Sequence, residues 1–151
     1  MISNYKIEFI TINQALELRQ KNLKPFLTLA ECKNSEDDSI LTKHFGIFYN
    51  NNCVSVATVF PESHKDFQCG NPYRLRGMAT DSQFRGQGFG SILLMHVFDY
   101  LKDIKCDLLW CNARLKALNF YKQNGFHAQS EIFELPQIGP HILMYKRIIP
   151  K

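Results

Sequence analysis

The sequence lacks the features that mark secreted, zinc-bound and membrane-spanning proteins. Its five cysteines are odd in number and contain no C-x-x-C pair, which argues against a disulfide framework and against a structural zinc site. No run approaches the roughly 20 apolar residues of a membrane span, and the opening MISNYK does not have the layout of a signal peptide. We therefore expect a cytoplasmic protein with no metal and no membrane partner.

The sequence also has no block of lysine and arginine. Its 18 basic and 14 acidic residues are scattered along the chain and give a net charge of +4. Proteins that bind nucleic acids usually gather their basic residues in one segment or on one face, so no nucleic-acid partner is expected. A chain of 151 residues, 45% of them hydrophobic, is typical of a globular protein. We expect one domain over residues 1–151.

The spacing of apolar residues predicts a chain that alternates between strands and helices. Alternation with a period of two predicts strands, and apolar residues three or four apart predict helices. The expected strands span residues 7–9, 44–49, 53–60, 73–80, 108–111, 128–133 and 142–147, and the expected helices span 11–24, 88–102 and 113–124. This order predicts an α/β fold with a mixed sheet, in which the helix at 88–102 joins two parallel strands.

Local signals support parts of this order. Thr11 and Gln14 have the spacing of a capping box at the start of the first helix, and the run of three asparagines at 50–52 suits the tight turn of a hairpin. Gly125 is of the type expected just past the end of the last helix. Residues 31–43 are mostly polar, which predicts a surface segment that could border a substrate cleft.

A glycine-rich turn between strand 73–80 and helix 88–102 is the strongest candidate for a ligand site. It reads Arg-Gly-Gln-Gly-Phe-Gly over residues 85–90, and its glycines let backbone N–H groups gather around an anion at a helix N-terminus. A P-loop requires a lysine and then a serine or threonine after the last glycine, whereas Ser91 follows Gly90 directly. A dinucleotide fingerprint requires glycines spaced G-x-G-x-x-G, and the spacing here is G-x-G-x-G. The turn therefore predicts a different phosphate-bearing ligand, with an empty tight turn as the alternative.

The turn resembles the acetyl-CoA pyrophosphate signature of the GNAT superfamily of N-acetyltransferases, Q/R-x-x-G-x-G/A, at Arg85, Gly88 and Gly90. A second segment at 117–126 is similar to the later A-x-x-F-Y-x-x-x-G-F element of that family, and an amphipathic helix lies between the two. The resemblance implies the GNAT acyl-CoA N-acyltransferase fold. This fold has a mostly antiparallel sheet with a splayed parallel pair, and helices on both faces.

The resemblance also implies an activity, in which the acetyl group of acetyl-CoA is transferred to the primary amine of a small molecule by direct attack in a ternary complex. Many members pair, so a homodimer is also considered. The residues expected to contact acetyl-CoA are Met78, Ala79, Thr80, Arg85, Gly86, Gln87, Gly88, Phe89, Gly90, Ser91, Asn119 and Tyr121.

Candidate catalytic residues follow from the reaction, which needs a base for the amine and benefits from an acid at the leaving thiolate. Tyr121 stands where the family's usual acid lies. The strand at 73–78 carries no carboxylate where the family often has its basic glutamate, so Glu62 is the candidate base, with His44, Asp38 or a water chain as alternatives. Arg76, His44 and Asn112 are expected to contact the acceptor.

Two departures from the family pattern leave alternatives open. Arg114 occupies a position where an asparagine often contacts CoA, so Asn112 or Asn119 could make that contact instead. Arg74 and Arg76 lie on one face of their strand, and one or both could bind an acidic acceptor. Because the base is unassigned, an acyl-CoA-binding sensor without transferase activity is an alternative function. An acetyltransferase acting on protein amines is another, although the loops at 31–43 and 61–72 favour a small acceptor.

Overall fold

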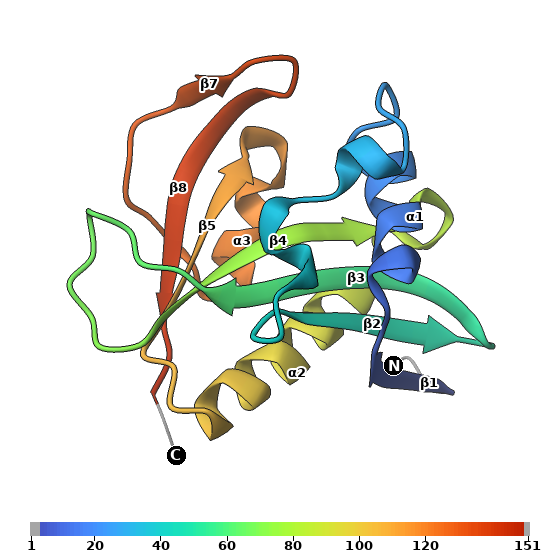
Figure 1. Cartoon of the computed structure of the whole chain (residues 1–151), viewed down its shortest axis with the longest axis horizontal. Helices are drawn as coiled ribbons and strands as arrows, with labels where there is room; N and C mark the ends of the chain where they lie inside the picture. Colours follow the sequence, from blue (N-terminus) through green and yellow to red (C-terminus); the bar gives the residue numbers. More distant parts are fainter. Residues whose placement is uncertain (1–3, 150–151) are drawn as a thin grey trace. The chain divides into compact units, whose positions relative to one another are not determined.

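The structure is a computed structural model and describes residues 4–149. The chain forms two compact units, shown in Figure 1. The first contains the residues up to Phe60 together with Gly77–Asp99, and the second contains Pro61–Arg76 together with the residues from Tyr100 onward. The elements of the first unit are β1 (Tyr5–Phe9), α1 (Ile12–Asn22), the 3-10 helices η1 (Ala30–Cys32), η2 (Ser35–Asp38) and η3 (Ser82–Phe84), β2 (Lys43–Tyr49) and most of β3 (Asn52–Pro61).

Besides β3, whose last residue lies in the second unit, two elements contribute to both units, namely β4 (Pro72–Thr80) and α2 (Phe89–Asp103). The remaining elements belong to the second unit: β5 (Leu108–Arg114), the 3-10 helix η4 (Leu115–Ala117), α3 (Leu118–Gln123), β6 (His127–Ala128), β7 (Phe133–Leu135) and β8 (Gly139–Arg147). β4 is hydrogen-bonded to both β3 and β5. Because β4 and β5 run parallel with α2 between them in the chain, the predicted parallel pair is confirmed.

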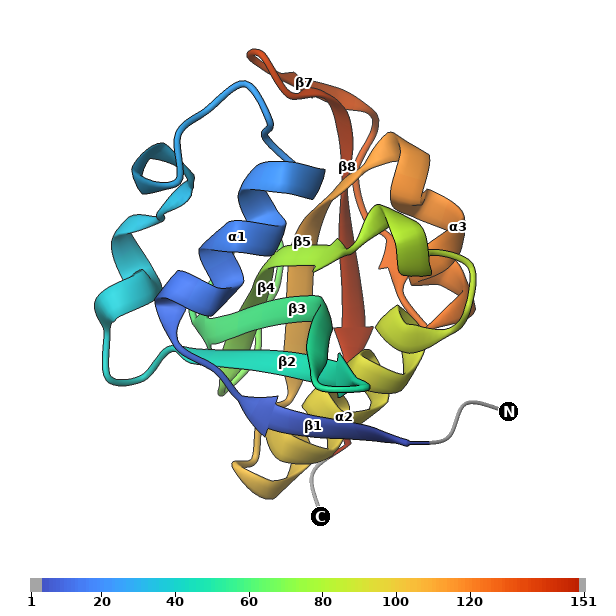
Figure 2. The same ribbon diagram turned by 90° about the vertical axis from the view of Figure 1, so that its right-hand side faces the viewer.

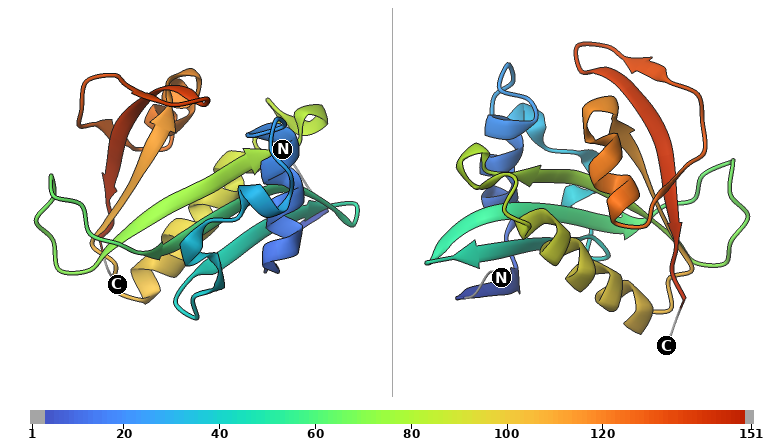
Figure 3. Two further views of the ribbon diagram at one scale, coloured as in Figure 1. Left: turned by 45° about the horizontal axis from the view of Figure 1, so that its top comes forward. Right: turned by 180° about the vertical axis from the view of Figure 1, so that it is seen from behind.

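The sheet of the first unit carries a helix on each face. β1, β2 and β3 pair antiparallel, with Phe45 opposite Ala57 and Gly46 opposite Val56. Since neighbouring residues of a strand point to opposite faces, Phe45 and Val56 lie on different sides. Leu18 of α1 packs with Val56, whereas Phe45 contacts His96 of α2. Figures 2 and 3 show α1 and α2 on opposite faces of this part of the sheet.

Local signals in the first unit correspond to the structure. The backbone N–H of Gln14 donates to Thr11 Oγ1 at 3.2 Å, and the N–H of Thr11 donates to Gln14 Oε1 at 2.9 Å, which is the predicted capping box. Asn50 and Asn51 both adopt positive φ in the turn between β2 and β3. The polar segment before β2, predicted as a surface loop or short helix, contains η1 and η2.

In the second unit the prediction of a helix over 113–124 was wrong at its start. Ala113 and Arg114 extend β5, where they pair with Ile142 and His141 of β8, and α3 begins only at Leu118. The predicted strand at 128–133 was also wrong. Here Ser130 Oγ accepts the N–H of Leu143, so a side chain replaces the backbone partner that a continuous strand would supply. The segment therefore divides into β6 and β7. Both errors arise because pairing with the distant strand β8 overrides local propensity.

Candidate functional site

The glycine turn joins β4 to α2 in the first unit. Asp81 begins it by accepting the N–H of Gln83 on Oδ1 at 2.9 Å, and its carbonyl accepts the N–H of Phe84 at 2.9 Å. Gly86 and Gly88 then adopt φ of 77° and 92°, a region that side-chain-bearing residues rarely occupy. Phe89 is buried at the start of α2. The turn is therefore fixed at both ends and exposed in its middle.

This exposed turn fits an anionic group. The first N–H groups of a helix have no intrahelical partner, and the helix dipole favours negative charge beside them. Near the start of α2 the backbone N–H of Ile92 donates to the carbonyl of Gly88 at 3.1 Å. At Gly86 an added Cβ would meet no atom within 4 Å, so there is open space against the backbone. The arrangement suits the close approach of a phosphate or diphosphate.

The end of β4 presents alternate backbone groups to its two edges. Asp81 N–H donates to the carbonyl of Val54 at 2.8 Å, and Ser55 Oγ donates to the carbonyl of Ala79 at 3.1 Å, so these groups face β3. Because the backbone N–H and C=O groups of successive residues in a strand point to opposite edges, those of Met78 and Thr80 point away from β3. Arg85 Nε donates to the carbonyl of Thr80 at 3.2 Å. A ligand that pairs with this strand would therefore use Met78 first.

In the second unit the pairing of β4 with β5 covers only three residue pairs. It runs from Pro72 opposite Leu108 to Arg74 opposite Trp110, although β5 continues to Arg114 and β4 continues past Leu75. The parallel pairing that the resemblance implied is therefore present within the second unit.

Tyr121, the candidate acid, lies on α3 and is only 8% exposed. Its ring contacts those of Phe120 and Phe126, each at 5.2 Å between centroids. Burial first, and the neighbouring Cys111 second, raise the pKa of Tyr121 well above its usual value, while Arg114 opposes them. The phenol therefore keeps its proton and can donate a hydrogen bond. Burial raises the pKa of the Cys111 thiol to about 12, which suits a core residue and not a nucleophile.

Glu62, the candidate base, is tied to the same strand as the two arginines. Its carboxylate accepts from Arg74 Nη1 at 3.2 Å, and its carbonyl accepts from Trp110 Nε1 at 2.9 Å. The Arg74 guanidinium also lies over the Trp110 ring at 4.7 Å. These contacts give Arg74 a packing role. A contact of Arg76 with the acceptor stays a prediction.

The structure gives His44 a role different from the predicted contact with a substrate. Its ring is 8% exposed, and both nitrogens have protein partners: Nδ1 lies 2.7 Å from Thr58 Oγ1 and Nε2 lies 3.0 Å from the carbonyl of Asp37. Neither nitrogen is left for an acceptor or for a proton from an amine. Asp38, another candidate base, is exposed and forms an ion pair with Lys33.

The other predicted site residues differ in exposure. Asn112 on β5 is half-buried, and Asn119 at the start of α3 is exposed. A contact of Asn112 or Asn119 with a ligand stays a prediction.

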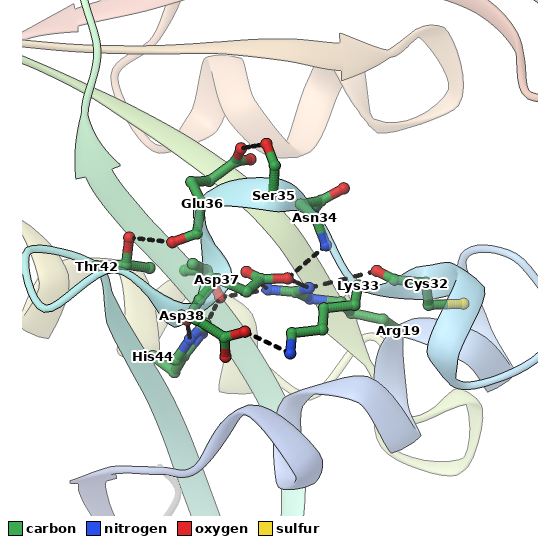
Figure 4. Close-up of polar contacts among 11 residues, drawn as sticks. Arg19, Cys32, Lys33, Asn34, Ser35, Glu36, Asp37, Asp38, Thr42 and His44 are labelled. Atoms are coloured by element: carbon green, nitrogen blue, oxygen red, sulfur yellow. Dashed lines mark hydrogen bonds and ion pairs between the residues drawn. The ribbon is translucent and has the colours of Figure 1, made fainter.

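A buried ion pair was missed in the sequence, and Figure 4 shows it. Arg19 of α1 is 2% exposed, and its guanidinium donates to both carboxylate oxygens of Asp37 at 2.7 and 3.0 Å. Nη2 of Arg19 also donates to Thr58 Oγ1 at 2.8 Å, and Asp37 Oδ2 accepts the N–H of Asn34 at 2.6 Å. The signal in the sequence was an arginine within the apolar stripe of α1, directly after Leu18.

The Arg19–Asp37 pair predicts a specific acid sensitivity. Burial alone would raise the pKa of Asp37, but the hydrogen bonds from Arg19 and Asn34 outweigh it and hold the pKa below its usual value. A carboxyl group with a lowered pKa stabilises the fold above the unfolded value of about 3.9 and loses this contribution as the pH falls through its folded pKa. The melting temperature of the wild type should therefore fall more steeply than that of Asp37→Asn below about pH 4, as measured by circular dichroism. Parallel curves would contradict this.

Among residues 4–149, no helix is both long and apolar enough to cross a membrane. Within the same residues, no three or more His, Cys, Asp and Glu side chains gather as metal ligands would. All five cysteines have unpaired thiols.

Comparison with known proteins identifies relatives over nearly the whole chain. The model of the acetyltransferase (GNAT) family matches residues 9–126. The chain is 34% identical over 143 residues to the uncharacterized N-acetyltransferase YitI of Bacillus subtilis (strain 168), covering 95% of this chain and 96% of that protein. An aminoglycoside 6'-N-acetyltransferase complexed with coenzyme A matches with a TM-score of 0.76 at 12% identity, over 97% and 98% of the two chains. The ribosomal-protein-S18-alanine N-acetyltransferase from Escherichia coli matches with a TM-score of 0.73 at 19% identity, over 97% and 96%.

Proposed function

The chain belongs to the acetyltransferase (GNAT) family of acyltransferases, and we propose that it transfers the acetyl group of acetyl-CoA to the primary amine of a small molecule. The main observation in support of acetyl-CoA as the donor is the turn at 85–90. There Gly86 and Gly88 adopt positive φ in an exposed loop at the start of α2. A protein of the same fold is complexed with coenzyme A, which supports an acyl-CoA donor. The aminoglycoside acetylated by that neighbour supports a small acceptor.

Within this proposal, the residues of the first unit bind the donor. The backbone N–H groups at 86–90 hold the diphosphate, and the backbone of Met78 pairs with the pantetheine arm. Arg85 holds the carbonyl of Thr80 at this end of β4 and completes the positive surroundings of the turn. Acetyl-CoA supplies a thioester whose carbonyl carbon the acceptor amine attacks directly, in a ternary complex.

Tyr121 acts as the acid of the reaction. Its phenol keeps its proton because burial raises its pKa, and its O–H donates to the sulfur that leaves as a thiolate. Hydrogen bonding to a group that becomes charged during the reaction lowers the barrier more than it stabilises the bound substrate. What supports the role of Tyr121 is its place in the second family motif and its protonated state.

Glu62 is the proposed base that takes the proton of the acceptor amine. Its carboxylate is held by Arg74 and is partly exposed to solvent, as a base that exchanges its proton with water must be. Glu62→Gln should lower kcat by at least about tenfold and leave the affinity for CoA unchanged, as measured by steady-state kinetics and titration calorimetry. An unchanged kcat would leave Glu62 only its contact with Arg74 and would favour a water chain as the base.

The function is tested with the purified protein, acetyl-CoA and a panel of amines, with free-thiol release as the measurement. The panel contains a polyamine, an aminoglycoside, an amino acid and a peptide with a free N-terminus. Stimulation by a small amine supports the proposal. Stimulation by the peptide alone would indicate an acetyltransferase for protein amines, and CoA binding without stimulated release would indicate a sensor.

A second measurement does not depend on the choice of acceptor. Mass spectrometry of the protein purified under native conditions should detect co-purified CoA or acetyl-CoA. For the location of the protein, we propose the cytoplasm, a reducing compartment, which the five unpaired thiols support.

A further inference from the structure

The buried Arg19 guanidinium lies between two segments that are distant in the sequence. On one side it forms the ion pair with Asp37 of η2 (Figure 4). On the other side lies Gly77 of β4, where an added Cβ would fall 2.9 Å from Cζ of Arg19 and closer still to Nε. Both contacts lie within the first unit. One side chain of α1 therefore touches the segment before β2 and the strand that leads into the glycine turn.

Hydrogen bonds hold this guanidinium in one position. Thr58 Oγ1 accepts from Arg19 Nη2, so its own proton is available to Nδ1 of His44. Nε2 of His44 faces the carbonyl of Asp37, which can only accept, so Nε2 carries the proton of the ring. The side chains of Arg19, Asp37, Thr58 and His44 thus each have a defined donor or acceptor role. The ring of contacts joins α1, η2, β2 and β3, and it leaves the guanidinium little freedom to move.

The edge of the guanidinium that faces β4 makes a packing contact. Among the described residues, Nε of Arg19 has no hydrogen-bond partner although it is buried. Gly77 covers it, with a φ of 64°. Any other residue at 77 would be strained by this φ and would also strike the guanidinium. Gly77 is therefore a glycine for two separate reasons, and Arg19 is one of them.

We propose that Arg19 is a positioning residue for acyl-CoA binding. The positive φ of Gly77 interrupts the extended conformation of β4. By packing against Gly77, the guanidinium fixes the position of this interruption, and with it the position of the backbone of Met78 and Thr80, one residue and three residues further on. This inference rests on the proposed function, because it assigns a purpose to the part of β4 that would pair with the pantetheine arm. A binding segment that is already in its bound geometry loses less conformational freedom on binding, which increases affinity.

Substitutions at Arg19 test this role through CoA affinity, which requires no knowledge of the acceptor. Arg19→Lys keeps the charge but lacks the planar fork that reaches Asp37 and Thr58 together. We expect it to weaken CoA binding by at least about tenfold in titration calorimetry. In steady-state kinetics with the best acceptor, KM for acetyl-CoA should rise more than kcat falls.

A matched control separates positioning from a loss of stability. Leu16 is a buried residue of the same helix, and its truncation by Leu16→Ala leaves a cavity without touching the ion pair. This variant should have a lower melting temperature and bind CoA within about twofold of the wild type. If Arg19→Lys bound CoA as the wild type does, or if Leu16→Ala weakened binding equally, the positioning role would be overturned. A wild type that did not bind CoA would instead overturn the proposed function.

A double-mutant cycle tests the contact between Arg19 and Gly77 directly. Arg19→Leu with Asp37→Asn removes both charges together, which avoids leaving one of them buried alone, and leucine has no atoms where Nε and Cζ lie. Gly77→Ala should lower the melting temperature less in this background than in the wild type, because only the strain of the positive φ remains. Equal losses in the two backgrounds would show that the guanidinium does not constrain Gly77. Should the charge-free background not fold, Arg19→Lys and its CoA affinity still decide the proposal.

Discussion

Tyr121→Phe is expected to lower kcat by about 100-fold, because removing one positioned hydrogen-bond donor from an anion that develops in the transition state costs about 10²–10³-fold in kcat. The change removes one oxygen and keeps the ring, so the contacts with Phe120 and Phe126 remain. A group that acts mainly on the leaving sulfur stabilises the transition state more than the bound substrate. The melting temperature and the affinity for CoA should therefore change little while kcat falls.

The measurement is steady-state kinetics on the best acceptor, combined with CoA titration and thermal unfolding. Tyr100→Phe is a matched control, since burial also raises the pKa of Tyr100 and this residue has no proposed role in the reaction. The control should keep the kcat of the wild type. If Tyr121→Phe also kept the kcat of the wild type, Tyr121 would not be the acid.

The pH dependence gives a second check on the same residue. Because the folded pKa of Tyr121 lies well above 10, the phenol keeps its proton over the whole range in which enzymes are usually assayed. Ionisation of Tyr121 should then cause no decline of kcat up to about pH 10. A decline that is present in the wild type below that pH and absent in Tyr121→Phe would contradict the protonated state described here.

The conformations around the candidate site that the sequence predicted are those that local geometry determines. The turn between β4 and α2 could be found because Gly86 and Gly88 occur where a strand meets a helix. Backbone conformations with positive φ favour glycine, and asparagine after it, whatever surrounds them. The capping box at Thr11 and the hairpin at 50–52 were predictable for the same kind of reason.

The parts that the sequence did not predict depend on contacts between distant residues. The burial of Arg19 is stabilised by Asp37 and Thr58, which lie 18 and 39 positions away in the chain. An arginine in a helix is usually exposed, and no local pattern states which one will have a buried carboxylate. Likewise, Arg74 and Arg76 are equivalent by alternation, and no local pattern states that Arg74 contacts Glu62 and Trp110.

The second large effect is expected at Gly86, where Gly86→Val should weaken CoA binding by about 100-fold. In the structure an added Cβ at this position meets nothing within 4 Å, so the protein itself has room for a side chain. The proposed diphosphate would occupy that room, and a branched side chain would keep it from the backbone N–H groups. Calorimetric titration with CoA measures the loss.

Gly139 provides a matched control for this experiment. Gly139 also has a positive φ, of 108°, and an added Cβ there likewise meets nothing within 4 Å. Gly139→Val should therefore also strain the backbone and should lower the melting temperature, as Gly86→Val does. Only Gly86→Val should lose affinity for CoA. Equal CoA affinities of the two variants would mean that the turn is a tight connection and not the diphosphate site, and the donor would then have to bind elsewhere on the chain.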